Sequence, residues 1–228
     1  MQNRKLSILL TAFTVLILNG SCKKNGNDDP CASTNITITA VVTNSDGNNG
    51  RVNSTASGST GFTYSKDSAP YVASGDFTGL APATYNITAK DANGCTKSQS
   101  FVVAATKTYY ITRNTWRFQS ATATGFGDVS AFLQTCQKDN ILTFAGTAGT
   151  GTGTIDEGAS KCNAGDPQTS PFTWNFLTNE TQLFVSAVLF SSGSSTFNVV
   201  TISATQLVLS QQITVSGIPT TVTVTFIH

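Results

Sequence analysis

Hydrophobic and polar side chains alternate along most of the chain beyond residue 35, and this period of two residues is typical of half-buried β-strands. In the first part of that region the alternating runs cover residues 36–43, 51–57, 60–65, 85–90 and 98–103. Clusters of Gly, Pro, Asn and Asp separate these runs at the spacing expected of a β-sandwich. The pattern therefore predicts a sandwich of two antiparallel sheets over residues 33–104.

The second part of the chain, residues 107–228, contains eight further alternating runs. They cover residues 116–121, 141–145, 152–157, 172–177, 182–187, 197–203, 207–215 and 221–227. Eight strands joined by short turns favour a closed up-and-down barrel, because closure leaves no unpaired edge strand. The composition changes near residues 104–107, between the two parts. We therefore expect an all-β chain, with an immunoglobulin-like β-sandwich followed by an eight-stranded barrel.

One short helix is expected between the first two runs of the barrel. Asp128 is a suitable N-cap, and Val129, Phe132 and Leu133 would share one face of the helix. The helix would end near Cys136 and close one end of the barrel.

The first 21 residues have the pattern of a signal peptide, with Arg4 and Lys5 ahead of an apolar run from Leu6 to Leu18. Small residues directly before Cys22 complete the processing site of a bacterial lipoprotein, in which Cys22 is acylated and begins the mature chain. A transmembrane anchor is the alternative, but the apolar run is shorter than the about 20 residues that a spanning helix needs. Two or more acyl chains would hold the protein at a membrane surface.

Residues 22–32 are expected to form a polar tether. The lysine pair at residues 23–24 and the aspartate pair at residues 28–29 resemble the short signal that directs lipoproteins of Bacteroidota to the outside of the outer membrane. The resemblance implies a protein that is anchored in the outer membrane and exposed at the cell surface. A periplasm-facing position is the alternative.

Charge and spacing argue against several classes of function. Only 11% of the residues are charged and the formal net charge is +1, so the chain has no basic field that would attract a nucleic acid. The only histidine, His228, has no nucleophile paired with it, and the adjacent Asp156 and Glu157 would point to opposite faces of a strand. No closely spaced Cys or His pair suggests a metal site. We expect no catalysis, no cofactor and no nucleic-acid partner, and the sequence leaves the oligomeric state open.

Four cysteines remain once Cys22 is assigned to the lipid, two in each predicted domain: Cys31, Cys95, Cys136 and Cys162. One disulfide per domain is the simplest pairing, although four cysteines allow three connectivities and free thiols are also possible. An exported protein encounters an oxidising environment, which favours disulfides. Each would stabilise its domain by roughly 3 to 4.5 kcal/mol in the chain-entropy estimate.

Within the first domain, three segments resemble the SprB-type repeat of Bacteroidota surface and gliding-motility adhesins. They are residues 58–64, 77–89 and 91–95, and the resemblance covers about residues 33–104. Asp67-Ser68-Ala69 also matches a short bacterial O-glycosylation sequon, so Ser68 is a candidate glycan site.

The second domain resembles the lipocalin-like domain of Bacteroidota lipoproteins over about residues 107–228. The order of five features carries this resemblance: the opening Trp strand, the short helix, residues 136–140 before a strand, residues 156–162, and residues 173–176. The resemblance implies a lipocalin-like barrel that holds a small hydrophobic ligand. The candidate residues for lining its apolar cup are Trp116, Phe118, Phe144, Trp174 and Phe176, although a barrel of eight strands is narrow and favours a packed interior filled by these side chains.

The sequence therefore predicts a tethered, non-catalytic binding module for a small hydrophobic ligand or a glycan, with the membrane as its other partner. The alternative is a structural or adhesive surface-display protein without a ligand pocket.

Overall fold

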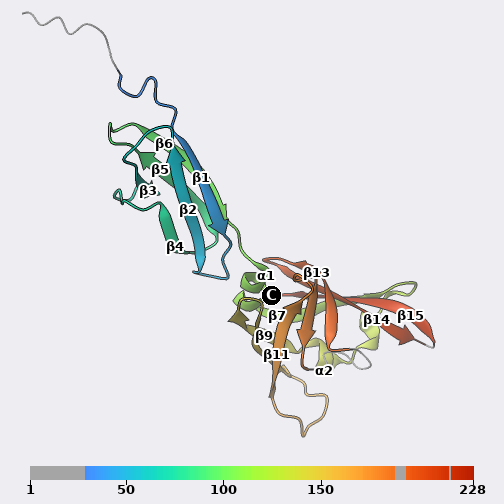
Figure 1. Ribbon diagram of the computed structural model, residues 1–228. Helices are drawn as coiled ribbons and strands as arrows, with labels where there is room; N and C mark the ends of the chain where they lie inside the picture. The colour runs from blue at the N-terminus through green and yellow to red at the C-terminus, as the bar shows by residue number, and fades with distance from the viewer. Residues whose placement is uncertain (1–28, 188–193, 216) are drawn as a thin grey trace, which may run out of the picture.

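The computed structural model describes residues 29–187, 194–215 and 217–228, which form a β-sandwich followed by a β-barrel (Figure 1). The predicted signal peptide, Cys22 and most of the predicted tether lie outside the described residues. One sheet of the sandwich consists of β1 (Thr37–Thr43), β2 (Gly50–Ser57) and β4 (Asp76–Leu80). The other consists of β3 (Thr63–Lys66), β5 (Ala83–Lys90) and β6 (Thr96–Val103). The predicted immunoglobulin-like β-sandwich is confirmed.

The two sheets of the sandwich enclose a small apolar core. Val52 of β2 and Ile87 of β5 are completely buried and lie on the inner faces of the two sheets. Strand β1 alternates between exposed and half-buried positions, as its sequence predicts. Strand β4 was not predicted, because it is short and only its last residue, Leu80, is buried.

The barrel is an all-next-neighbour sheet of eight long strands that closes when β15 pairs with β7. A two-residue strand, β8 (Gly127–Asp128), adds to the end of β7. The eight strands are β7 (Thr115–Ala123), β9 (Ile141–Thr147), β10 (Thr150–Asp156), β11 (Thr169–Leu177), β12 (Gln182–Val185), β13 (Thr196–Ile202), β14 (Gln206–Val215) and β15 (Ile218–Ile227). The predicted eight-stranded up-and-down barrel is confirmed.

Large aromatic side chains fill one end of the barrel. Phe144 contacts the rings of Phe172 and Trp174 edge to face, with centroids 5.2 and 5.8 Å away. Gly153 makes room for this packing, because a Cβ there would lie 2.2 Å from the ring of Phe172. This end of the barrel is therefore a packed core, as expected for a small barrel whose interior is just wide enough for side chains.

Helix α1 (Lys107–Arg113) covers the packed end, and the sequence did not predict it. The hydroxyl of Thr106 accepts a hydrogen bond from the Tyr109 N–H, which caps the first turn. Ile111 is completely buried, and its carbonyl accepts a hydrogen bond of 2.9 Å from the Trp116 indole. Packing against the barrel thus fixes a helix in a segment rich in β-branched and aromatic residues, which favour strands.

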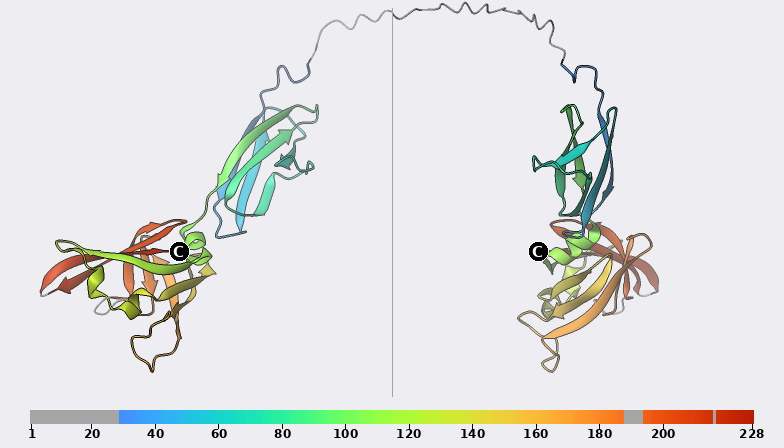
Figure 2. Two further views of the ribbon diagram at one scale, coloured as in Figure 1. Left: turned by 180° about the vertical axis from the view of Figure 1, so that it is seen from behind. Right: turned by 60° about the vertical axis from the view of Figure 1, so that its left-hand side comes forward.

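The turn between β1 and β2 connects the sandwich to the barrel (Figure 2). The Ser45 N–H donates to the Ala104 carbonyl, and Ser45 in turn accepts from the Thr106 N–H. Asp46 accepts from the Thr106 hydroxyl at 2.5 Å and from the Ala148 N–H at 2.8 Å. One loop of the sandwich therefore contacts both the linker and the β9–β10 turn of the barrel.

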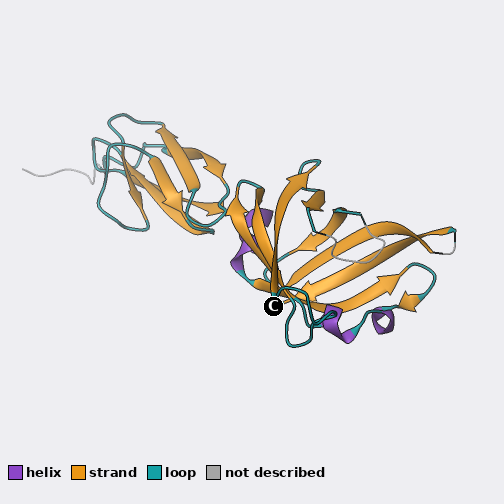
Figure 3. Ribbon diagram, turned by 90° about the horizontal axis from the view of Figure 1, so that it is seen from below, coloured by secondary structure: helices purple, strands orange, loops and turns teal. Residues whose placement is uncertain are grey.

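The helix predicted after Asp128 is replaced by two shorter elements, the 3₁₀-helix η1 (Ser130–Phe132) and helix α2 (Thr135–Lys138). Asp128 accepts a hydrogen bond from the Ser130 N–H, as an N-terminal capping residue would. The prediction of one continuous helix was wrong, because Leu133 adopts an extended conformation between the two elements. Figure 3 shows α1 beside the sandwich and the two short helices further along the barrel.

Candidate functional site

An apolar cavity of about 440 Å³ lies at the end of the barrel opposite α1. Strands β7, β14 and β15 and the segment between β7 and β9 form its wall. Its lining residues are Ala121, Ala123, Phe126, Val129, Phe132, Leu133, Gln137, Ile213, Thr220, Val222 and Val224. Among these described lining residues none carries a charge, and only Gln137 and Thr220 are polar.

Small side chains on β7 leave the space that the cavity occupies. Ala121 pairs with Val224 and Ala123 pairs with Val222 across the β7–β15 ladder. A register shift places Phe118 and Ser120 opposite consecutive residues of β15, so Gln119 is an extra residue in β7. The two alanines consequently face inward, although strict alternation from Trp116 would direct them outward. The barrel is filled by aromatic rings at one end and is hollow at the other.

Two phenylalanines at the border of the cavity are exposed to solvent. Phe126 is 59% exposed and Phe132 is 85% exposed. Val129 and Leu133, by contrast, are partly buried and pack against the barrel core. The segment expected to plug the barrel therefore forms one wall of the cavity, while Phe132 points away from the core rather than sharing the buried face.

The five aromatic residues predicted to line a ligand cup lie elsewhere in the barrel. Trp116, Phe144 and Trp174 are at most 1% exposed and belong to the packed core. Phe118 and Phe176 are partly buried and pack against that core. None of the five borders the cavity described above. The structure shows a packed interior for the three buried rings, which is the role that the sequence favoured for these side chains over lining a ligand cup.

Sequence reasoning missed the residues that form the cavity, because it searched for large aromatic side chains. The useful signal was the opposite one, namely the pair of alanines at inward positions of β7. The inward orientation of these alanines depends on the extra residue at Gln119, and the alternation of hydrophobic and polar residues does not reveal where that extra residue lies.

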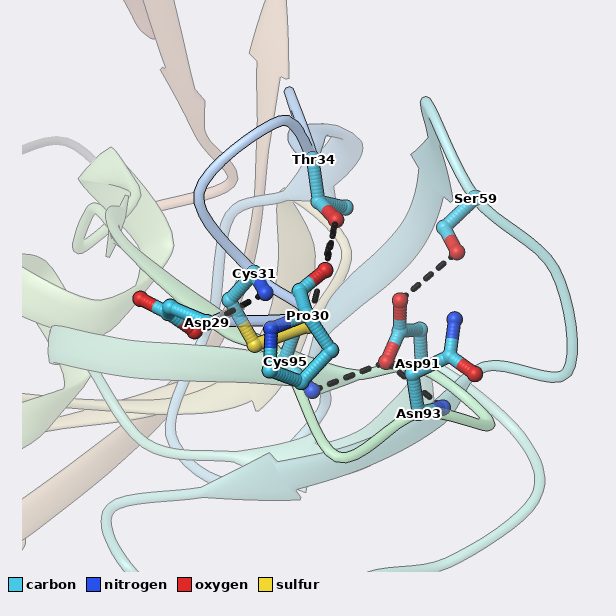
Figure 4. Close-up of a disulfide and its surroundings, with 8 residues drawn as sticks. All are labelled: Asp29, Pro30, Cys31, Thr34, Ser59, Asp91, Asn93 and Cys95. Carbon is cyan, nitrogen blue, oxygen red and sulfur yellow. Dashed lines mark hydrogen bonds between the residues drawn. A yellow bond between two sulfur atoms is a disulfide. The ribbon is translucent and has the colours of Figure 1, made fainter. Parts of the chain in front are cut away.

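The disulfide between Cys31 and Cys95 closes the end of the sandwich remote from the barrel (Figure 4). Next to it, Asp91 is 3% exposed and accepts hydrogen bonds from the Ser59 hydroxyl at 2.6 Å and the Cys95 N–H at 2.8 Å. These donors, with the Ser59 hydroxyl contributing most, lower the pKa of Asp91 below its ordinary value. Asp91 orders the turn that carries Cys95.

The second disulfide joins Cys136 of α2 to Cys162 in the β10–β11 loop. It holds α2, which carries Gln137, to the barrel beside the cavity. Asp139 supports the same region, since its Oδ2 accepts from the backbone N–H groups of Ala159 and Ser160. Both disulfides pair cysteines within one domain, as the simplest reading of the sequence predicted.

Asp156, at the end of β10, is hydrogen-bonded to the loop that follows this strand. Its Oδ1 accepts from the Gln168 side-chain amide at 2.7 Å and from the Gly158 N–H at 3.0 Å. These hydrogen bonds lower the pKa of Asp156. Asp156 therefore fixes the start of the loop that contains Cys162.

Ser68, the candidate glycan site, is exposed in the loop after β3, and it adopts a left-handed φ of 65°. Its modification stays a prediction.

Across residues 29–187, 194–215 and 217–228, no helix combines the length and apolar character needed to cross a membrane. In the same described ranges, no three His, Cys, Asp or Glu side chains gather in a position to hold a metal ion.

Neither a protein-family model nor a curated protein matches the chain. Among solved structures, the chain is similar to Japanin from Rhipicephalus appendiculatus, whose structure contains bound cholesterol. The sequence identity is 13% and the TM-score is 0.36, over 52% of this chain and 76% of Japanin. The fold assignment therefore rests on the strand order and closure described above.

Proposed function

We propose that the chain is a non-catalytic binding protein whose barrel holds one small hydrophobic molecule in the cavity at its open end. The observation that carries the proposal is the composition of this cavity, in which nine of the eleven lining residues are apolar. Its volume of about 440 Å³ falls in the range of small-molecule sites, roughly 300–1,000 Å³. Transfer of an apolar molecule from water into such a space is favourable.

A glycan fits this cavity less well than a hydrophobic molecule does. A sugar carries many hydroxyl groups, and each of them needs a hydrogen-bond partner when it leaves water. Only two lining residues, Gln137 and Thr220, are polar, and the Thr220 hydroxyl already donates to the Ile218 carbonyl. Of the two ligand classes expected from the sequence, a hydrophobic molecule and a glycan, the cavity therefore favours the hydrophobic molecule.

We also propose that the protein acts at a membrane surface to which Cys22 anchors it. The support comes from the sequence: the basic start, the short apolar run and the small residues before Cys22. In this proposal the protein belongs to the outer membrane and is exposed at the cell surface. A lipid-anchored carrier would keep its site close to a source of hydrophobic molecules.

The experiment that tests ligand binding is a titration with the neutral fluorescent probe N-phenylnaphthylamine. The wild-type chain should bind one probe per molecule. Ala121→Leu and Ala123→Leu each place a larger side chain in the cavity and should weaken binding at least about tenfold. Ala145→Leu is the matched control, because Ala145 lies on an exposed position of β9. Absence of probe binding by the wild type, or equal binding by all variants, would contradict the proposed site.

A further inference from the structure

We infer that the cavity selects an uncharged ligand with a hydrogen-bond-accepting oxygen, such as a long-chain alcohol or ester, and that Gln137 is the residue that recognises this oxygen. The inference rests on the proposed binding function and specifies the chemical class of its ligand. It follows from the hydrogen bonding of Gln137 and from the charges around the cavity.

The capping interaction of α2 fixes the orientation of the Gln137 amide. Its Oε1 accepts a hydrogen bond of 3.0 Å from the Gln134 N–H, in a reciprocal capping box. The acceptor end of the amide is thus engaged, and Nε2 has no hydrogen-bond partner within the described part of the chain. Gln137 borders the cavity, so this N–H₂ group is a donor available to a ligand oxygen.

The other interior glutamine at this level of the barrel is not available to a ligand. Gln211 pairs with the cavity-lining Val222 across the β14–β15 ladder. Its Nε2 already donates to the carbonyl and hydroxyl oxygens of Ser194 and to the Thr196 carbonyl, at 2.7–2.9 Å. Gln137 is therefore the lining residue whose amide can donate to a bound molecule.

An ionised ligand in this site would lose its hydration without gaining a residue of opposite charge. Among the described lining residues none is charged, and burial of an unpaired carboxylate is strongly unfavourable. Lys138 follows Gln137, but its charge acts on the Asp128 carboxylate, where it helps to lower the pKa of that residue after the larger effect of Ser130. A fatty alcohol should consequently bind more tightly than the fatty acid of the same chain length.

Competition between the neutral probe and two ligands of equal length, hexadecanol and ionised palmitate at neutral pH, tests this inference in the full mature chain. We expect hexadecanol to displace the probe at a concentration at least about tenfold lower than palmitate. Gln137→Glu keeps an acceptor for the Gln134 N–H but removes the donor, whereas Gln137→Met removes both. Both variants should bind methyl palmitate, whose ester oxygens can only accept, roughly three- to tenfold more weakly than the wild type does, the change that loss of one net hydrogen bond corresponds to.

The possible results separate the two proposals. Failure of the wild type to bind the probe would overturn the binding function itself. Normal probe binding with equal or tighter binding of palmitate would overturn the selection of an uncharged ligand, and sensitivity of palmitate binding to Lys138→Met would identify an ion pair instead. Unchanged methyl palmitate affinity in both Gln137 variants, with unchanged probe binding, would remove Gln137 from the site.

Discussion

The imidazole of His228 covers the indole of Trp116, with ring centroids 4.2 Å apart and an angle of 41° between the ring planes. Nδ1 of His228 lies 3.0 Å from the Thr115 carbonyl oxygen, and Nε2 lies 2.7 Å from the Ala204 carbonyl oxygen. The residue after the last strand is therefore held against the first strand and against the β13–β14 turn. His228 helps to close the barrel at its packed end.

Replacement of His228 by Ala should lower the free energy of unfolding of the barrel by about 1 kcal/mol, because an aromatic contact and a hydrogen bond from the imidazole N–H to a backbone carbonyl are lost at an exposed site. Urea denaturation followed by tryptophan fluorescence measures this change. His228→Phe keeps the ring contact alone and should fall between the wild type and the alanine variant. Equal stability of all three proteins would show that the contact has no energetic role.

Loss of Asp91 ionisation should destabilise the sandwich. Because the pKa of Asp91 is lowered in the folded state, its contribution is present above the unfolded pKa of about 3.9 and disappears as the pH falls through the lower folded pKa. Asp91→Asn should therefore be less stable than the wild type at pH 7, with a difference that shrinks as the pH falls below the unfolded pKa of about 3.9. Ser59→Ala removes the largest cause and should raise the pKa of Asp91. Urea midpoints across this pH range test the prediction, and a difference independent of pH would contradict it.

Removal of either disulfide should destabilise its own domain. The bridges close loops with sequence separations of 64 and 26 residues, which correspond to about 4.3 and about 3.5 kcal/mol in the chain-entropy estimate. The double variant Cys136→Ser with Cys162→Ser should also weaken probe binding, because this bridge holds the helix that carries Gln137. Cys31→Ser with Cys95→Ser is the matched control and should leave binding unchanged. Calorimetry and probe titration of both variants provide the measurements, and equal effects on binding would argue against a role for α2.

Replacement of Cys22 by Ala should release the protein from the membrane fraction, because the variant has no thiol to acylate. Cell fractionation followed by detection of the protein measures this effect. Protease treatment of intact cells expressing the wild type should remove the protein if it is exposed at the surface. Membrane retention of the variant would contradict the lipid anchor, and protection of the wild type from protease would favour the periplasm-facing alternative.

The strands could be predicted because each barrel strand has one buried and one exposed face. The last run shows this pattern, with Val224 and Phe226 buried and the intervening Thr225 less so. Helix α1 could not be predicted in this way, because its sequence favours a strand and its helical state depends on the burial of Ile111. The single helix predicted after Asp128 is interrupted at Leu133, whose extended backbone separates two short helices and whose side chain packs against the barrel core.

The site was harder to predict than the fold. Large side chains such as Trp174 are conspicuous in a sequence, but in this barrel they fill the space in which a ligand would bind. The cavity depends on Ala121 and Ala123, and their inward orientation depends on the extra residue at Gln119. The role of Gln137 depends on the capping box, which exists only once α2 is folded.

The most direct test of the central claim is to locate a bound ligand by NMR, with a nitroxide-labelled long-chain alcohol and methyl-labelled protein. Broadening should concentrate on the methyl groups of Ala121, Ala123, Val222 and Val224, which line the cavity. Leu183 in the packed end and Val52 in the sandwich are the internal references and should broaden least. Saturable broadening centred on Leu183 or Val52, or no saturable broadening in the barrel, would contradict a ligand site at its open end.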